Sequence, residues 1–150
     1  MNFKVTTEMI NFYFNIYNEK YFNSTLPLPN FCIIHRSSVF GYFRYTPSNG
    51  VVCNPIIEIS DKYNYTEDQL EDVLVHEMLH YYLAYTGKDK KCRHGKEFKK
   101  YADDLNLNYG LNIQKTYNPK YFEKYPSDNK FIRFLTKIFY GKKENEQPLI

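Results

Sequence analysis

A chain of 150 residues with 43% hydrophobic content is long enough to bury one core and too short for two, so we expect a single domain over residues 1–141 and a flexible tail over residues 142–150. No apolar run approaches the roughly 20 residues of a membrane span, and the amino terminus lacks the apolar core of a signal peptide, which excludes a membrane partner and favours a cytoplasmic protein. The net charge is +3, and three widely spaced cysteines without a C-x-x-C pair argue against a disulfide framework and a cysteine-based zinc module.

The first half of the chain predicts one helix and a small sheet. Hydrophobic residues recur at helical spacing over residues 7–22, and Thr6 or Thr7 can cap this helix. Three runs rich in β-branched and aromatic residues follow, at 31–38, 39–46 and 55–60, separated by Ser, Pro, Asn and Gly. We therefore expect an α+β fold, in which a small antiparallel sheet of three or slightly more strands packs on helices.

A second helix is predicted to begin after Thr66, because Gln69 three residues later completes a capping box. Gly87 is its natural end. Between residues 73 and 85 the helix is apolar on nearly every side, as expected for a central helix buried against a sheet. A third helix is expected over residues 95–105 and a fourth over residues 129–140.

The central helix carries the pattern H-E-M-L-H at residues 76–80. Residues four apart share one helix face, so His76 and His80 can present two nitrogens to one metal ion, at about 2.0–2.1 Å for zinc, with Glu77 beside them. Burying two imidazoles and a carboxylate without partners costs several kcal/mol, on the order of 1–3 kcal/mol for each neutral polar group. A metal ion is the partner that the pattern predicts.

A tetrahedral zinc site needs a third protein ligand, for which His94 is our choice. A polar loop over residues 88–94 is long enough to turn back toward the helix, and Gly95 would permit a close approach. The rival ligands are Cys92, Glu97, Asp103 and Asp104. A metzincin would need glycine and histidine where this chain has Leu83 and Thr86, so that class is excluded. We expect His35 to be a structural or surface residue.

Several stretches of the chain resemble the SprT-like metalloprotease family, whose members include a DNA-repair protease. They are YFNSTLPLP at residues 21–29, HEMLH at 76–80 and HGKEF at 94–98, within a region of about residues 8–110. The resemblance implies one zinc ion per chain held by His76, His80 and His94, with Glu77 as the catalytic residue and Phe98 packing against the site. Because no cysteine follows Cys92, it implies a minimal version without the carboxyl-terminal zinc ribbon of many relatives.

The expected function is zinc-dependent hydrolysis of peptide bonds, directed at proteins associated with or crosslinked to DNA. Glu77 would act as the general base toward a zinc-activated water. Tyr42, Arg44 and the tyrosines after His80 are candidate donors to the developing oxyanion. The alternative is a nucleic-acid-binding protein with a structural zinc site and no turnover, which would have no use for Glu77 beside its ligands.

Charge is unevenly distributed along the chain. Residues 1–87 carry five Lys/Arg and nine Asp/Glu, whereas residues 88–150 carry fifteen and eight, so the net charge changes from −4 to +7. This asymmetry indicates an anionic partner, which the family resemblance suggests is DNA, single-stranded or in a disrupted duplex. The simpler alternative is a solvated basic face. The candidate contacts are Lys88, Lys90, Lys91, Arg93, Lys96, Lys99 and Lys100, with residues 130–143 as possible support.

Overall fold

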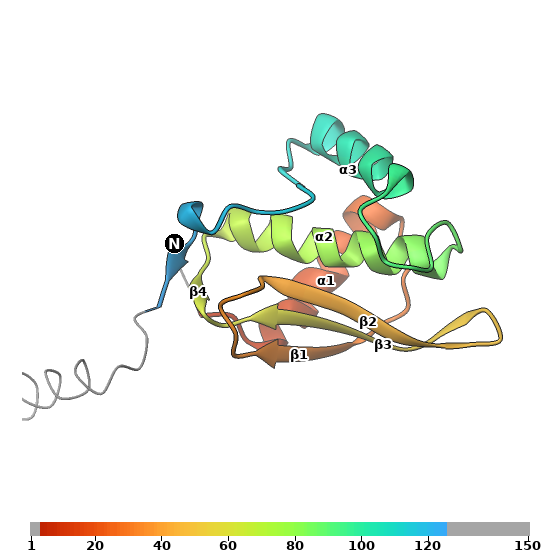
Figure 1. Cartoon of the computed structure of the whole chain (residues 1–150), viewed down its shortest axis with the longest axis horizontal. Helices are drawn as coiled ribbons and strands as arrows, with labels where there is room; N and C mark the ends of the chain where they lie inside the picture. Colours follow the sequence, from red (N-terminus) through yellow and green to blue (C-terminus); the bar gives the residue numbers. More distant parts are fainter. Residues whose placement is uncertain (1–3, 126–150) are drawn as a thin grey trace, which may run out of the picture.

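The computed structural model describes residues 4–125, which form three helices and two small sheets (Figure 1). The predicted fourth helix and the tail lie outside these residues. The elements in chain order are α1 Thr7–Phe22, β1 Asn30–Ile34, β2 Gly41–Ser48, β3 Val51–Ser60, β4 Tyr63–Asn64, α2 Glu67–Tyr85, α3 Lys96–Tyr109, a 3-10 turn at Pro119–Tyr121 and β5 Glu123–Lys124. The expected α+β class is confirmed. Among the described residues, no helix is long and apolar enough to cross a membrane.

Helix α1 begins and ends where the sequence predicts. The Thr6 side chain caps it by accepting a hydrogen bond from the Met9 amide, at 3.2 Å. At the other end Asn23 adopts a left-handed conformation with φ 51°, and the following segment leads into β1. The buried residues of α1 are Ile10, Phe14, Tyr17, Asn18 and Phe22. They place one face of the helix in the core.

The main sheet has the strand order β1-β3-β2 and mixed directions. Strands β2 and β3 form an antiparallel hairpin, whose turn uses Asn49 and Gly50 with φ 49° and 75°. Strand β1 is parallel to β3, so the expectation of a wholly antiparallel sheet is wrong. The chain reverses direction between β1 and β2 and again between β2 and β3, so β1 and β3 run the same way. Because β3 lies between β1 and β2, it pairs with β1 in parallel. This central position suits the residues Ile57 and Ile59 of β3, which are fully buried.

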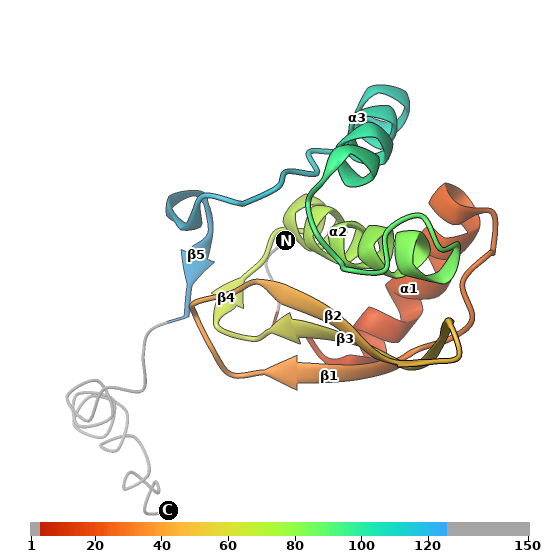
Figure 2. The same cartoon turned by 45° about the vertical axis from the view of Figure 1, so that its right-hand side comes forward.

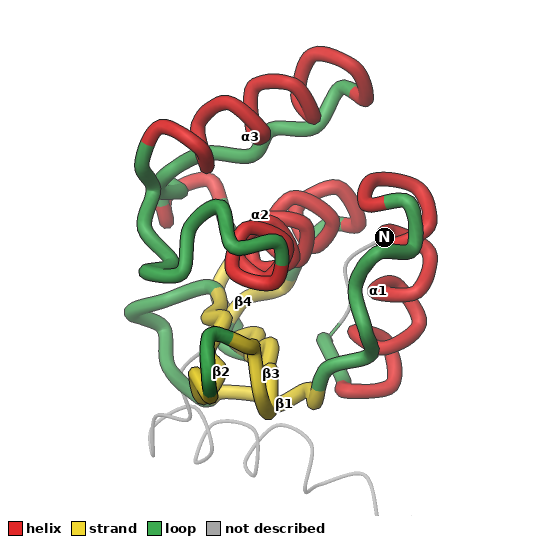
Figure 3. Tube along the Cα trace, turned by 90° about the vertical axis from the view of Figure 1, so that its right-hand side faces the viewer, coloured by secondary structure: helices red, strands yellow, loops and turns green. Residues whose placement is uncertain are grey.

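Helix α2 lies between the main sheet and α3, and α1 packs beside it on the same side of the sheet (Figures 1 and 3). The predicted capping box is present, because Thr66 Oγ1 accepts from the Gln69 amide and Gln69 Oε1 accepts from the Thr66 amide. The helix ends at Tyr85, just before Gly87 with φ 75°. Twelve of its residues are buried, so α2 forms the centre of the core as predicted.

The chain beyond α3 returns along α2 in a way that the sequence does not predict. Helix α3 extends to Tyr109, four residues past its expected end, and stops at Gly110 with φ 69°. The Asn112 amide then donates to Asp72 Oδ1 at 2.9 Å. Strand β5 finally pairs with β4 in a second, two-stranded sheet (Figure 2). This return path covers the amino-terminal half of α2.

Candidate metal centre

His76 and His80 lie on consecutive turns of α2, with Glu77 next to His76, where the helix is buried on all sides. The exposed fractions of His76, Glu77 and His80 are 6%, 7% and 5%. The neighbouring residues Val75, Met78 and Leu79 are completely buried. Imidazole and carboxylate groups in such surroundings need polar partners within the protein or from a bound ion.

A short loop brings His94 to the two histidines of α2. The chain turns at Gly87 and at Cys92, which have φ 75° and 50°. The Asp89 carboxylate holds the turn, because it accepts hydrogen bonds from the Lys91 amide at 2.9 Å and the Arg93 amide at 3.1 Å. His94 therefore reaches the cluster immediately before α3. Among residues 4–125, an added Cβ at Gly95 would meet no atom within 4 Å, so the close approach expected at this glycine is wrong.

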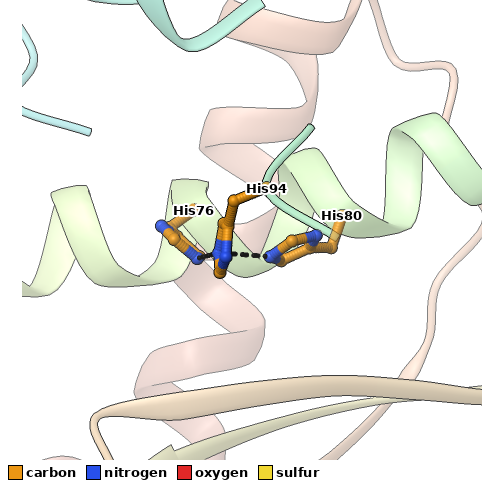
Figure 4. Close-up of side chains that lie close together, drawn as sticks. All are labelled: His76, His80 and His94. Carbon is orange, nitrogen blue, oxygen red and sulfur yellow. Dashed lines mark hydrogen bonds between the residues drawn. The ribbon is translucent and has the colours of Figure 1, made fainter. Parts of the chain in front are cut away.

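The three imidazoles turn the same atom toward one point (Figure 4). His94 Nε2 lies 2.9 Å from His76 Nε2 and 3.1 Å from His80 Nε2. Each ring nitrogen offers a single in-plane lone pair or N–H, so His94 Nε2 cannot form two good hydrogen bonds at once. Three nitrogens around a tetrahedral zinc ion lie roughly 3.3 Å apart, given Zn–N bonds of about 2.0–2.1 Å. The arrangement thus fits a shared metal ion better than mutual hydrogen bonding.

The Phe98 ring on α3 packs against all three histidine rings. Its ring centroid is 4.8 Å from that of His76, 4.7 Å from that of His80 and 4.7 Å from that of His94. Contact with all three rings restricts their orientation. The packing role that the family resemblance implies for Phe98 therefore has a direct geometric basis.

Burial keeps the histidines neutral. It lowers the pKa of His76 to about 3, with further contributions from His80 and His94. It lowers the pKa of His80 to about 4 and also lowers that of His94. Within residues 4–125 the Nδ1 atoms of His76 and His80 are buried without a hydrogen-bond partner of good geometry, and the backbone of Gln114 lies close enough to His76 to oppose the shift of its pKa. Neutral imidazoles are the protonation state that metal ligation requires.

Glu77 lies between α2 and the edge strand β2. Burial raises the pKa of its carboxyl group to about 8, and a backbone hydrogen bond from Phe43 partly opposes this shift. Gly41 explains how the carboxylate fits, because a Cβ at this position would stand 3.1 Å from Glu77 Oε1 and 2.9 Å from the Glu58 carbonyl oxygen. The sequence reasoning missed both Gly41 and Phe43, since no local pattern marks a contact between β2 and α2.

The other candidate ligands lie outside the cluster. Within residues 4–125, the ligand atoms that come within 4.8 Å of one another in a group of three belong to His76, His80 and His94. Burial raises the pKa of the Cys92 thiol to about 11, which disfavours the thiolate that binds metals. Asp103 pairs with Lys99 at 2.6 Å, and His35 with Asp61 at 2.7 Å. His35 is thus a surface residue with a structural partner, as expected.

The candidate oxyanion donors do not face the histidines. Tyr42 and Arg44 point away from α2, on the opposite face of the sheet, because Phe43 between them is the buried residue of β2. Tyr81 donates to the Pro27 carbonyl at 3.0 Å, and the Tyr82 ring packs against Phe22 and Tyr101. Tyr85 is 46% exposed.

The sequence reasoning also missed Tyr117, from the returning segment. Its ring centroid lies 5.7 Å from that of His76. Its hydroxyl group donates to the Asp72 carbonyl at 3.1 Å and is therefore committed to the fold. Tyr117 thus encloses the cluster on the His76 side and offers no free donor to a substrate.

The basic residues named from the sequence lie on the surface next to His94. All seven are exposed, from Lys88 to Lys100. The Lys88 ammonium lies 5.8 Å from the centre of the Tyr101 ring, and Lys90 approaches the β2–β3 turn at Gly50. The structure thus places exposed cations on the loop that leads to His94 and on the first turns of α3.

The fold and the cluster define an α+β protein whose central helix presents a three-histidine candidate metal site. The family model described as the SprT-like family matches residues 10–124, and the chain belongs to this family. Membership indicates a metalloprotease-like domain. Comparison with curated proteins and with solved structures found no match.

Proposed function

We propose that this protein is a zinc-dependent metalloprotease. The observation that carries the proposal is the convergence of three neutral imidazoles through Nε2, at 2.9 and 3.1 Å, beside a buried carboxylate on the same helix. His76, His80 and His94 would hold the ion, and Zn²⁺ bound there would supply Lewis-acid chemistry toward a peptide carbonyl and a water molecule. Membership of the SprT-like family supports the choice of metal and reaction.

Glu77 performs the proton transfers in this mechanism. Its carboxylate takes a proton from the attacking water as the new C–O bond forms at the scissile carbonyl carbon. It then gives that proton to the amide nitrogen as the C–N bond breaks, so hydrolysis consumes one water and the base is regenerated. Burial raises the pKa of Glu77, which disfavours the carboxylate form, so we expect its function as a base to depend on a bound cation nearby.

The proposed substrate is a protein associated with or crosslinked to DNA. The support for it is the exposed basic surface at residues 88–100, next to His94, together with the charge of the second part of the chain. Phosphate groups of single-stranded or disrupted DNA would bind there and bring attached proteins to the cluster. The alternative, a structural zinc site without turnover, leaves the buried Glu77 without a role.

Glu77→Gln tests the chemistry separately from the fold. The amide fills the same volume but cannot accept a proton, so we expect zinc content and thermal unfolding close to those of the parent and a loss of peptide hydrolysis of at least about 100-fold. The measurements are metal analysis of the purified protein and cleavage of an unstructured protein substrate. Glu71→Gln, a change at an α2 glutamate away from the cluster, is the matched control. Undiminished cleavage by Glu77→Gln would rule out the assigned base.

A further inference from the structure

The outer face of the main sheet, opposite α2, contains a hollow of about 400 Å³. Its lining residues are Arg36, Tyr42, Arg44 and Glu58. Tyr42 and Glu58 are cross-strand partners, and they alternate along their strands with residues buried against α2. Neither α1 nor α2 covers this face (Figures 1 and 3). The hollow is therefore separate from the histidine cluster.

The hollow carries one more positive charge than negative charge. Arg44 Nη2 donates to Glu58 Oε1 at 3.1 Å, and the Glu58 side chain is 12% exposed against 60% for Arg44. The carboxylate thus lies beneath the guanidinium, which keeps further N–H donors on its solvent side. Among residues 4–125, Arg36 has no carboxylate within salt-bridge distance. Its charge is available to a ligand.

Arg36 is held next to an aromatic ring by a fixed piece of backbone. Its guanidinium carbon lies 5.7 Å from the centre of the Tyr42 ring. Its carbonyl oxygen accepts a hydrogen bond from Ser60 Oγ at 2.5 Å, and the next carbonyl, of Ser37, accepts from the Tyr63 hydroxyl at 2.5 Å. These two bonds anchor the start of the loop that joins β1 to β2, so Arg36 does not depend on a long flexible segment for its position.

Two guanidinium groups and an aromatic ring around one hollow favour a particular ligand chemistry. Guanidinium groups donate paired hydrogen bonds to phosphate oxygens, and bases stack on aromatic rings and on guanidinium planes. We propose that this hollow binds one nucleotide of a single-stranded nucleic acid, with its phosphate at Arg36 and Arg44 and its base against Tyr42. The inference rests on the nucleic-acid partner of the proposed function but does not require peptide hydrolysis.

The course of β2 favours a single-stranded nucleic acid over a free nucleotide as the ligand. Strand β2 is an edge of the main sheet and carries Tyr42 and Arg44. At the next residue, the Tyr45 hydroxyl donates to the Lys90 carbonyl at 2.7 Å. The same strand thus links the hollow to the basic surface at residues 88–100. A single-stranded nucleic acid that follows this edge of the sheet would meet both the arginines of the hollow and the basic residues at 88–100.

The test measures binding of a labelled oligothymidylate by fluorescence anisotropy over a range of salt concentrations. We expect Tyr42→Ala to weaken affinity at least about fivefold, because loss of one stacked base costs about 1–3 kcal/mol. Arg36→Gln should also weaken affinity at least about fivefold, because it removes a cation that would contact the phosphate. Arg36→Gln should also reduce the magnitude of the salt slope by about 0.7, the value for one lost phosphate contact. Tyr42→Phe should bind as the parent does, because it retains the ring. The exposed Lys120→Gln controls for the loss of one charge.

Parent-like binding by Arg36→Gln and Tyr42→Ala would overturn the inference, and so would undetectable binding by the parent at low salt. Thermal unfolding of each variant identifies any loss of fold, and Tyr42→Phe then provides the folded comparison. Cleavage of a protein substrate without nucleic acid should be unchanged in Arg36→Gln. If the parent cleaves nothing while the binding results are as expected, the protease proposal fails and the nucleotide site stands.

Discussion

His94 is the ligand candidate that depends most on the fold, because it reaches the cluster from a loop and not from α2. His94→Ala should lower zinc affinity by more than the 10–100-fold that is typical for loss of a ligand's hydrogen-bond partner, since a ligand itself is removed. Competition with a chromogenic chelator measures this affinity. His35→Ala and Cys92→Ala are the controls, and both should retain zinc as the parent does. Normal retention in His94→Ala with loss in Cys92→Ala would show that the third ligand is the cysteine.

Gly41 is expected to position Glu77. In Gly41→Ala the new methyl group would lie 2.9 Å from a backbone oxygen of β3, which cannot move easily, and 3.1 Å from the Glu77 carboxylate, which can. A displacement of about 1 Å can cost roughly 100-fold in rate, so we expect kcat to fall at least about tenfold while zinc content stays unchanged. Overpacking should also lower stability by about 1–3 kcal/mol. Steady-state cleavage and urea unfolding measure the two effects.

Gly95→Ala is the matched control for this prediction, because an added Cβ there meets none of the described residues within 4 Å although Gly95 adjoins His94. It should cleave as the parent does. Equal kcat in Gly41→Ala and the parent would show that β2 does not set the position of the carboxylate.

The residues of the cluster differ in how far sequence could predict them. His76 and His80 follow from helical spacing, which fixes their shared face before any tertiary contact forms. His94 follows only once the loop length and the family resemblance are added. Gly41 and Tyr117 could not be predicted, because they meet α2 through strand packing and a returning loop whose courses leave no local pattern. The outward direction of Tyr42 and Arg44 depends on strand register, which a single residue shift would reverse.

Among the elements, those with local start and stop signals were predicted best. The capping residues Thr6 and Thr66 set the beginnings of α1 and α2, and both are confirmed. The parallel pairing of β1 with β3 was missed, because strand direction depends on the order of strands in the sheet and not on their composition. The pairing of β4 with β5 was also missed, since two-residue strands some sixty positions apart give no periodic pattern.

Two asparagines act as clamps between a helix and the segment that follows it. Asn18 Nδ2 donates to the Leu26 carbonyl at 2.8 Å, and Asn18 Oδ1 accepts from the Leu26 amide at 3.1 Å. Asn106 makes the same pair of bonds with Ile113, at 3.0 and 2.7 Å. Each amide group satisfies both backbone groups of one buried residue. The clamps hold the chain where it leaves α1 and α3.

Asn18→Ala should therefore destabilise the protein strongly. It leaves the amide and carbonyl of Leu26 buried without partners, at a cost of about 1–3 kcal/mol each, so we expect the free energy of unfolding to fall by about 2–4 kcal/mol. Asn15→Ala is the matched control on the same helix, because Asn15 is exposed and, in the described part of the chain, bonds only to Asn11 of α1. Its effect should stay within about 0.5 kcal/mol. Urea unfolding followed by circular dichroism decides, and equal midpoints for the two variants would refute the clamp.

At the scale of the whole molecule, the two cationic surfaces lie on different sides of β2. The basic surface at residues 88–100 adjoins His94, whereas the hollow with Arg36 and Arg44 lies on the outer face of the sheet. The acidic excess of residues 1–87 includes Glu67, Glu71 and Asp72 at the start of α2. These acidic residues lie at the start of α2, whereas the loop with Lys88, Lys90 and Lys91 follows its end, so opposite charges flank the two ends of this helix, which would orient a polyanion toward the end that carries His80.

The role of the loop between α2 and α3 in DNA binding can be tested without disturbing the backbone of this loop. In a triple variant with Lys90, Lys91 and Arg93 replaced by Glu, the bonds from the Lys91 and Arg93 amides to Asp89 remain, as does the bond from Tyr45 to the Lys90 carbonyl. The loop should therefore still deliver His94, and zinc content should be unchanged. Single-stranded DNA binding should weaken, because three cations that we expect to contact phosphates become anions.

Affinity of the parent should fall linearly with log salt, with a slope of about −0.7 for each phosphate contact on a single strand. The triple variant should show a slope smaller in magnitude by about 2, since about three contacts are lost, together with weaker binding at every salt concentration. An equal charge reversal at the exposed residues Lys4, Lys62 and Lys120 is the control, because a purely global charge effect would change binding as much as the loop variant does. Unaltered binding in the loop variant, or equal weakening in both, would show that residues 88–100 are only a solvated basic face.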